Sequence, residues 1–163
     1  MSLQPLIRGP QDGETVYAVG VLHRMLAEKS ETGGSYSLME VVVPPQSGPP
    51  PHLHHREDEG FYLLSGQITI CGEDQPGINL TTGSFAHLPR GRRHWFRNNS
   101  DEPAKLLILA APGGLEAMFR EIGTVVPQST QLDALPAMTI EEQQHLLSVA
   151  PSYGLEILVP AKA

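Results

Sequence analysis

The chain has 163 residues, of which 40% are hydrophobic and 18% charged, as expected for a compact globular protein and not for a disordered or collagen-like one. A formal net charge of -7 argues against nucleic acid as a partner, and a single cysteine excludes an intrachain disulfide. With 15 prolines and 16 glycines between short apolar runs, the chain is predicted to be all-β.

The N-terminal residues 1–14 have no apolar core behind a basic stretch, unlike a signal peptide. The longest apolar run, residues 106–111, is too short to span a bilayer. We therefore expect a cytoplasmic protein without a membrane partner. The expected organisation is a single domain over residues 1–163, with a barrel core at about 15–112 and a helical extension at about 113–163.

Segments rich in β-branched and aromatic residues predict most of the strands. Residues 15–27 and 35–43 are the first two, and an edge formed by them could pair with a second copy in a homodimer. The proline-rich residues 44–51 predict an extended connector, and residues 72–77 a polar turn. The later predicted strands are 61–64, 67–71, 84–88, 94–97 and 104–111.

Two short helices are predicted after the last of these strands. Leu115, Met118, Phe119 and Ile122 recur at helical spacing before Gly123, and this apolar stripe is expected to cap one end of the barrel or to seal a dimer. Thr139 with Glu142 forms a capping-box pattern for a second helix, which Pro151 stops.

Four side chains have the chemistry and spacing of a metal site. His52 and His54 are two residues apart, so on a strand they point to the same face. Glu59 opens the next strand, and His94 opens a later one. Three imidazoles and a carboxylate suit one divalent transition metal ion: iron, manganese, nickel, cobalt, copper or zinc.

The same residues resemble the two signature motifs of the cupin superfamily. The first is matched, with a shorter interval after its first glycine, by Gly48, His52, His54, Glu59 and Gly66. The second is matched at every interval by Gly83, Pro89, Gly91, His94 and Asn98. The resemblance implies a double-stranded β-helix, or jelly roll, with a metal held by His52, His54, Glu59 and His94. More narrowly, residues 50–66, 89–98 and 106–116 look similar to single-domain bacterial cupins related to quercetin 2,3-dioxygenases.

The other histidines and the arginines are interpreted as structural or exposed. Strand parity turns His55 away from the predicted ligands, and His23 and His145 are expected at the surface. His87 is expected to be a hydrogen-bonded core residue, the alternative being a position in the lumen. The arginines could attract an anionic substrate, although a solvated turn is favoured; they are Arg90, Arg92, Arg93 and Arg97.

The expected function is a dioxygenase acting on a small flavonol-like, enol or phenol substrate. Phe61, Leu63 and Phe96 share strand parity with the ligands and are expected to form an apolar substrate pocket. Glu59 is the candidate catalytic residue, because it could also accept the proton of a substrate hydroxyl. The alternatives are a non-catalytic sensor or storage protein that binds metal and a metabolite, and a metal-assisted isomerase.

Overall fold

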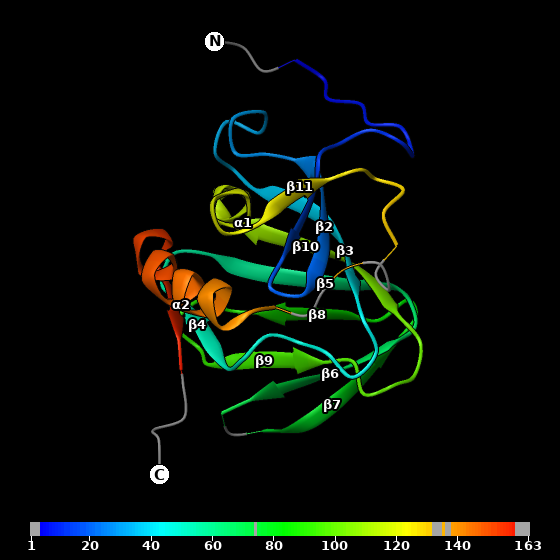
Figure 1. Cartoon of the computed structure of the whole chain (residues 1–163), viewed down its shortest axis with the longest axis vertical. Helices are drawn as coiled ribbons and strands as arrows, with labels where there is room; N and C mark the ends of the chain where they lie inside the picture. Colours follow the sequence, from blue (N-terminus) through cyan, green and yellow to red (C-terminus); the bar gives the residue numbers. More distant parts are fainter. Residues whose placement is uncertain (1–3, 74, 132–134, 136–137, 159–163) are drawn as a thin grey trace.

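A computed structural model of the chain describes residues 4–73, 75–131, 135 and 138–158. Its strands form two antiparallel sheets that enclose one core (Figure 1), which confirms the all-β prediction. The seven-stranded sheet has the order β11 (Thr124–Val126), β1 (Thr15–Ala18), β2 (Val21–Ala27), β3 (Ser37–Val43), β10 (Ala104–Ala111), β5 (Asp58–Ser65) and β8 (Phe85–Leu88). The five-stranded sheet has the order β12 (Leu155–Ile157), β4 (His52–His54), β9 (His94–Arg97), β6 (Gln67–Gly72) and β7 (Gln75–Thr81).

The core follows the two-residue period of the strands. In β3, Met39, Val41 and Val43 are fully buried, whereas the residues between them are partly exposed. Strand β10 pairs with β3 and buries Leu106 and Ile108 on the same side. Because every second side chain enters the space between the sheets, residues with this parity in β4, β5 and β9 also face the interior.

The predicted first strand is in fact a hairpin. Strands β1 and β2 pair around a turn at Val19 and Gly20, which have φ values of 56° and 73°. Gly20 is an ordinary turn residue, but valine rarely adopts a positive φ because its branched Cβ crowds the backbone there, so Val19 hides the turn in the sequence. The turn directs the face of β2 that carries Val21 and His23 toward the interior.

Strand β7 replaces the second half of the polar turn predicted at residues 72–77. The strand begins at Gln75 and includes Pro76 and Gly77, two residues that normally interrupt strands. It lies at an edge of the five-stranded sheet, where a proline that cannot donate a ladder hydrogen bond is tolerated.

Both predicted helices are present, and they lie side by side at one flank of the barrel (Figure 1): α1 (Leu115–Ile122) and α2 (Ile140–Val149). The capping box of Thr139 and Glu142 is formed, and the short 3-10 helix η2 (Ala150–Tyr153) follows α2. The β structure does not end near Pro112 as expected, because β11 pairs with β1 and β12 pairs with β4. No helix within the described residues is long and apolar enough to cross a membrane.

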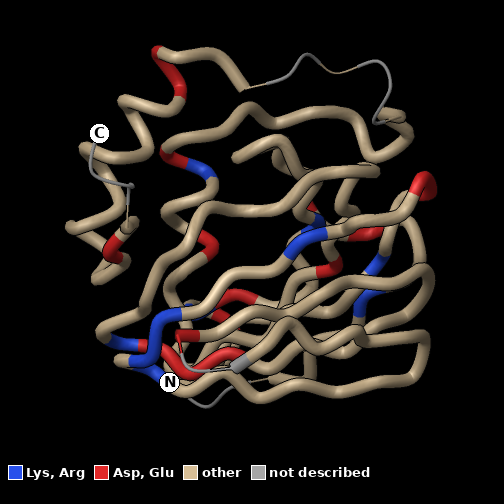
Figure 2. Tube along the Cα trace, turned by 90° about the horizontal axis from the view of Figure 1, so that it is seen from below, with Lys and Arg blue, Asp and Glu red and all other residues tan. Residues whose placement is uncertain are grey.

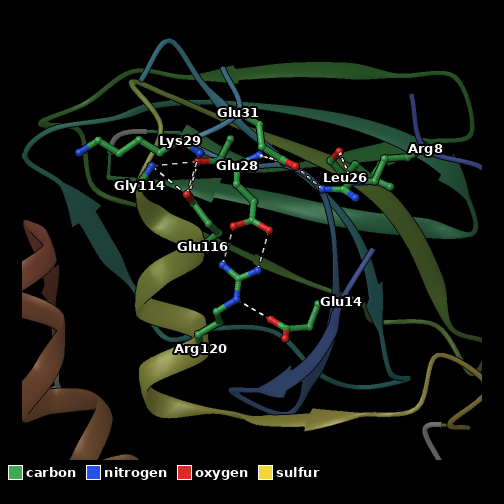
Figure 3. Close-up of polar contacts among 10 residues, drawn as sticks. Arg8, Glu14, Leu26, Glu28, Lys29, Glu31, Gly114, Glu116 and Arg120 are labelled. Carbon is green, nitrogen blue, oxygen red and sulfur yellow. Dashed lines mark hydrogen bonds and ion pairs between the residues drawn. The ribbon is translucent and has the colours of Figure 1, made fainter. Parts of the chain in front are cut away.

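Helix α1 is fixed to the barrel by polar contacts (Figure 3). Arg120 donates to both carboxylate oxygens of Glu28, at 2.7 and 2.8 Å, and also to Glu14. Buried Glu116 accepts hydrogen bonds from Ser37 and from the backbone N–H groups of Lys29, at 2.8 Å, and Gly114, at 3.0 Å. These contacts hold the apolar face of α1 against the barrel; Leu115 and Met118 are buried there, as the predicted stripe requires.

The proline-rich connector lies against β9. A Cβ atom on Gly48 would come within 2.1 Å of the Phe96 carbonyl oxygen, so only glycine permits this close approach. Ser47 accepts a 2.8 Å hydrogen bond from the Asn98 N–H, and the fully buried Asn98 amide donates to the Val43 carbonyl at 3.2 Å. The connector therefore delivers β4 directly beside β9.

The segments before Pro44 do not provide the expected free edge. Strand β11 pairs with β1, so the described edges of the seven-stranded sheet are β11 and β8. A homodimer stays a prediction, and its interface would have to use another surface.

Candidate metal centre and cavity

The four predicted ligands come from three strands and converge between the two sheets. His52 of β4 lies opposite His94 of β9 in the five-stranded sheet. His52 and His54 are both buried while Leu53 between them is partly exposed, as expected for one face of a strand. Glu59 comes from β5 of the other sheet. The site therefore forms only when the barrel closes.

One potential ligand atom from each of the four residues lies within 4.8 Å of the others. Oε2 of Glu59 is 3.0 Å from Nε2 of His94 and 3.2 Å from Nε2 of His54. The four side chains are between 2% and 8% exposed, so bulk water does not screen their charges. Such a cluster of nitrogen and oxygen donors has the composition of a transition-metal site.

The hydrogen bonds of Nδ1 in His52 and His94 determine which ring nitrogen is free to bind a metal ion. Nδ1 of His52 is 2.8 Å from the Pro50 carbonyl oxygen, and Nδ1 of His94 is 3.1 Å from that of Arg92. A carbonyl oxygen only accepts, so each Nδ1 carries the hydrogen and each Nε2 of a neutral ring has a free lone pair, that of His94 facing Oε2 of Glu59 at 3.0 Å. Two facing acceptors repel unless a positive charge lies between them. A metal ion fits this requirement.

The third histidine lies beside a second buried carboxylate. Nδ1 of His54 is 3.4 Å from Oε2 of Glu57, which is only 5% exposed. A carboxylate behind a metal-binding imidazole is a common arrangement, because it fixes the ring and raises its basicity. The sequence analysis did not identify Glu57; its one signal is its position three residues after His54.

Burial and neighbouring charges shift the pKa values of three residues of the cluster. Burial lowers the pKa of His52 to about 4, although the charge of Glu59 opposes this. Burial also disfavours protonated His54, but Glu59 and Glu57 outweigh it and raise the pKa of that ring to about 9. Burial would raise the pKa of Glu59, but His54 and the other imidazoles hold it well below its usual range. A metal ion bound here would displace the His54 proton.

A cavity of about 80 Å³ opens beside the cluster. Phe61 and Phe96 lie on its wall and meet edge to face, with ring centroids 5.4 Å apart. Leu63 is fully buried in the core and is not among the wall residues. The rest of the wall comes from the β1–β2 turn, β2, β3, β10, the connector, both helices and β12. Its apolar residues are Val19, Val21, Val41, Pro49, Pro50, Ile108, Leu115, Met118, Phe119, Leu146, Leu155 and Ile157.

Two histidine predictions are wrong. His23 is buried and lies on the cavity wall, because the Val19–Gly20 turn sets β2 with this face inward and α1 covers it. His87 is exposed rather than in the core or lumen, because it lies on the outer face of β8. His145 is exposed as expected, and exposed His55 pairs with Glu156 at 2.9 Å.

Three of the four arginines make contacts away from the cavity. Arg90 forms a two-pronged contact with Asp58, at 2.8 and 3.1 Å, and Arg97 donates to the Gln46 carbonyl at 3.0 Å. Arg93 lies over the Trp95 ring, 5.6 Å from its centroid. In Figure 2 the basic segments lie beside acidic ones. None of these arginines is among the wall residues of the cavity, which agrees with the favoured interpretation as a solvated turn.

Comparisons with known proteins agree with this geometry. Residues 39–110 match the cupin domain. The chain is 29% identical over 119 residues to quercetin 2,3-dioxygenase of Bacillus subtilis (strain 168), covering 73% of the chain and 35% of that protein. It is 26% identical over 122 residues to quercetin 2,3-dioxygenase of Aspergillus japonicus, covering 71% and 35%. The chain thus spans about a third of the length of these relatives (35%).

Solved structures share the fold. KdgF from Halomonas sp. matches with a TM-score of 0.60 at 15% identity, over 70% of this chain and 98% of that one. The polyketide cyclase RemF from Streptomyces resistomycificus matches with a TM-score of 0.56 at 24% identity, over 68% and 80%. A protein with a double-stranded β-helix domain from Klebsiella pneumoniae matches with a TM-score of 0.50 at 19% identity, over 65% and 84%. The two sheets therefore form a double-stranded β-helix.

Proposed function

Since the chain belongs to the cupin superfamily, we propose that it is a metal-dependent dioxygenase that acts on a small enol or phenol substrate. The observation that carries the proposal is the convergence of His52, His54, His94 and Glu59 on one point beside an apolar cavity. An apolar wall suits a ring, and a group of metal-binding side chains at one end suits an oxygen atom on that ring.

The four residues of the cluster would hold one transition metal ion. When bound, the ion would supply Lewis acidity at a substrate oxygen and a site for dioxygen. Glu59 is the one carboxylate among the described wall residues, so it is the candidate acceptor for the proton of the substrate hydroxyl. Phe61 and Phe96 would contact the apolar part of the substrate, and Leu63 would support them from the core.

The size of the cavity limits the substrate. A volume of about 80 Å³ is small beside drug-sized ligand sites, which occupy about 300–1,000 Å³. A single ring is therefore a better fit than a flavonol, unless the wall moves. A cavity of this size also accommodates the second candidate function, in which the protein binds metal and a small metabolite without converting it.

Oxygen uptake distinguishes these candidates. Protein purified without chelator would be assayed for metal and then for dioxygen consumption with phenols, enols and flavonols, separately with iron, manganese, nickel, cobalt and copper. Substrate-dependent uptake that is lost in Glu59→Gln supports the dioxygenase. Substrate binding without uptake under every metal would leave the binding protein as the function.

A further inference from the structure

His23 occupies an unusual position for a polar side chain. It lies in β2 between Val21 and Met25, which are buried on the same face of the strand. The ring stacks on Phe119 of α1, with centroids 4.0 Å apart and an interplanar angle of 25°. Both rings belong to the cavity wall. A phenylalanine or leucine would fill this place in the core without burying a polar group.

One of the two ring nitrogens of His23 is unsatisfied. Nδ1 of His23 is buried and has no hydrogen-bond partner among the described residues. Burial lowers the pKa of His23 to about 4, and hydrogen bonding toward the backbone of Val16 and Val21 opposes this only in part. The imidazole is therefore neutral near pH 7 and has a donor and an acceptor nitrogen. An unsatisfied buried group is unfavourable for folding, and a ligand that bonds to it would offset that cost.

Among the described wall residues, His23 is the one polar side chain outside the metal centre. Apart from it and the metal-centre residues His52, His54 and Glu59, the described wall residues are valine, proline, phenylalanine, isoleucine, leucine and methionine. None of them is lysine or arginine. A ligand in this cavity thus meets two kinds of polar group, the metal centre and the imidazole of His23.

We propose that His23 is a second polar contact for the substrate, positioning it by a hydrogen bond to an oxygen other than the one at the metal centre. This inference rests on the proposed function, because the metal centre is taken to hold the first oxygen. It narrows the substrate class to a small planar ring that carries two separated oxygen functions. It disfavours sugar phosphates and dicarboxylates, since a second anionic group would find no cation on the described wall.

The test uses zinc-loaded protein, because zinc has no redox chemistry and the ligands are not consumed. Dissociation constants for phenol, resorcinol and hydroquinone would be measured by ligand-observed NMR titration. One hydrogen bond corresponds to a preference of about 3- to 10-fold for at least one of the dihydroxy rings over phenol. The variants are His23→Phe, which keeps the stack on Phe119, and His23→Asn, which keeps a polar atom near the position of Nδ1. His87→Phe on the outer face of β8 is the matched control.

We expect the preference in wild type and His87→Phe, its loss in His23→Phe, and partial recovery in His23→Asn, with zinc stoichiometry unchanged and each preference taken relative to phenol for the same protein. A purely structural His23 would not produce this pattern. A preference that persists in His23→Phe, or is missing from wild type, overturns the role of His23 and leaves the metal centre standing. Failure of wild type to bind zinc overturns both proposals.

Discussion

Replacing His23 with phenylalanine should change how stability depends on pH. The buried ring has a pKa of about 4, against 6.5 for an ordinary histidine. Between these values the unfolded chain binds a proton at His23 that the folded protein does not, so stability falls as the pH is lowered through this window. At about pH 5 the loss amounts to about 2 kcal/mol, and above about pH 7 it is negligible. His23→Phe removes this contribution and keeps the stack on Phe119.

The assay is urea unfolding of wild type and His23→Phe at about pH 7.5 and about pH 5, after removal of metal so that metal binding does not add stability. The other titrating groups contribute equally to both proteins and cancel in the comparison. We expect His23→Phe to gain about 2 kcal/mol relative to wild type on acidification. Exposed His145→Phe is the control and should gain nothing. Parallel pH dependences for wild type and His23→Phe would refute the assignment of a buried neutral imidazole.

Three further changes test other parts of the account. Glu57→Gln should weaken zinc binding about 10- to 100-fold in a chelator competition, because the carboxylate supports His54 as a ligand. Glu156→Gln at the surface is the control and should not weaken it. Equal zinc affinities of the two variants would contradict the role of Glu57. Leu146→Ala should lower the free energy of unfolding by about 2–5 kcal/mol and admit larger ring ligands, and failure to bind them would show that Leu146 does not limit the cavity. Asn98→Ala should cost at least about 2 kcal/mol in urea unfolding, because buried backbone carbonyls lose their donor, and a neutral effect would contradict that role.

The sequence was a good guide where the signal is local or fixed by a motif. The strands β9 and β10 and the helix α1 begin and end at the predicted residues. Their alternation or helical periodicity is regular, and turn residues bound them. The positions of His52, His54, Glu59 and His94 followed from strand parity and two motifs, and the structure brings their donor atoms together.

The sequence was a poor guide where pairing or tertiary packing decides. The hairpin at Val19 depends on a positive φ that valine seldom adopts, and β7 contains a proline that only an edge strand tolerates. Strands β11 and β12 have three residues each and depend on their partner strands. The burial of His23 depends on this hairpin and on α1, which are distant from the two motifs.

Metal binding by the four-residue cluster is the central claim, and elemental analysis tests it most directly. Wild-type protein and a variant with His52→Ala, His54→Ala and His94→Ala would be incubated with iron, manganese, nickel, copper or zinc, desalted and analysed, with circular dichroism to confirm that the variant is folded. We predict close to one ion per chain in wild type for at least one metal and none in the variant. Wild type that retains none of these metals, or a folded variant that retains as much as wild type, would contradict the account.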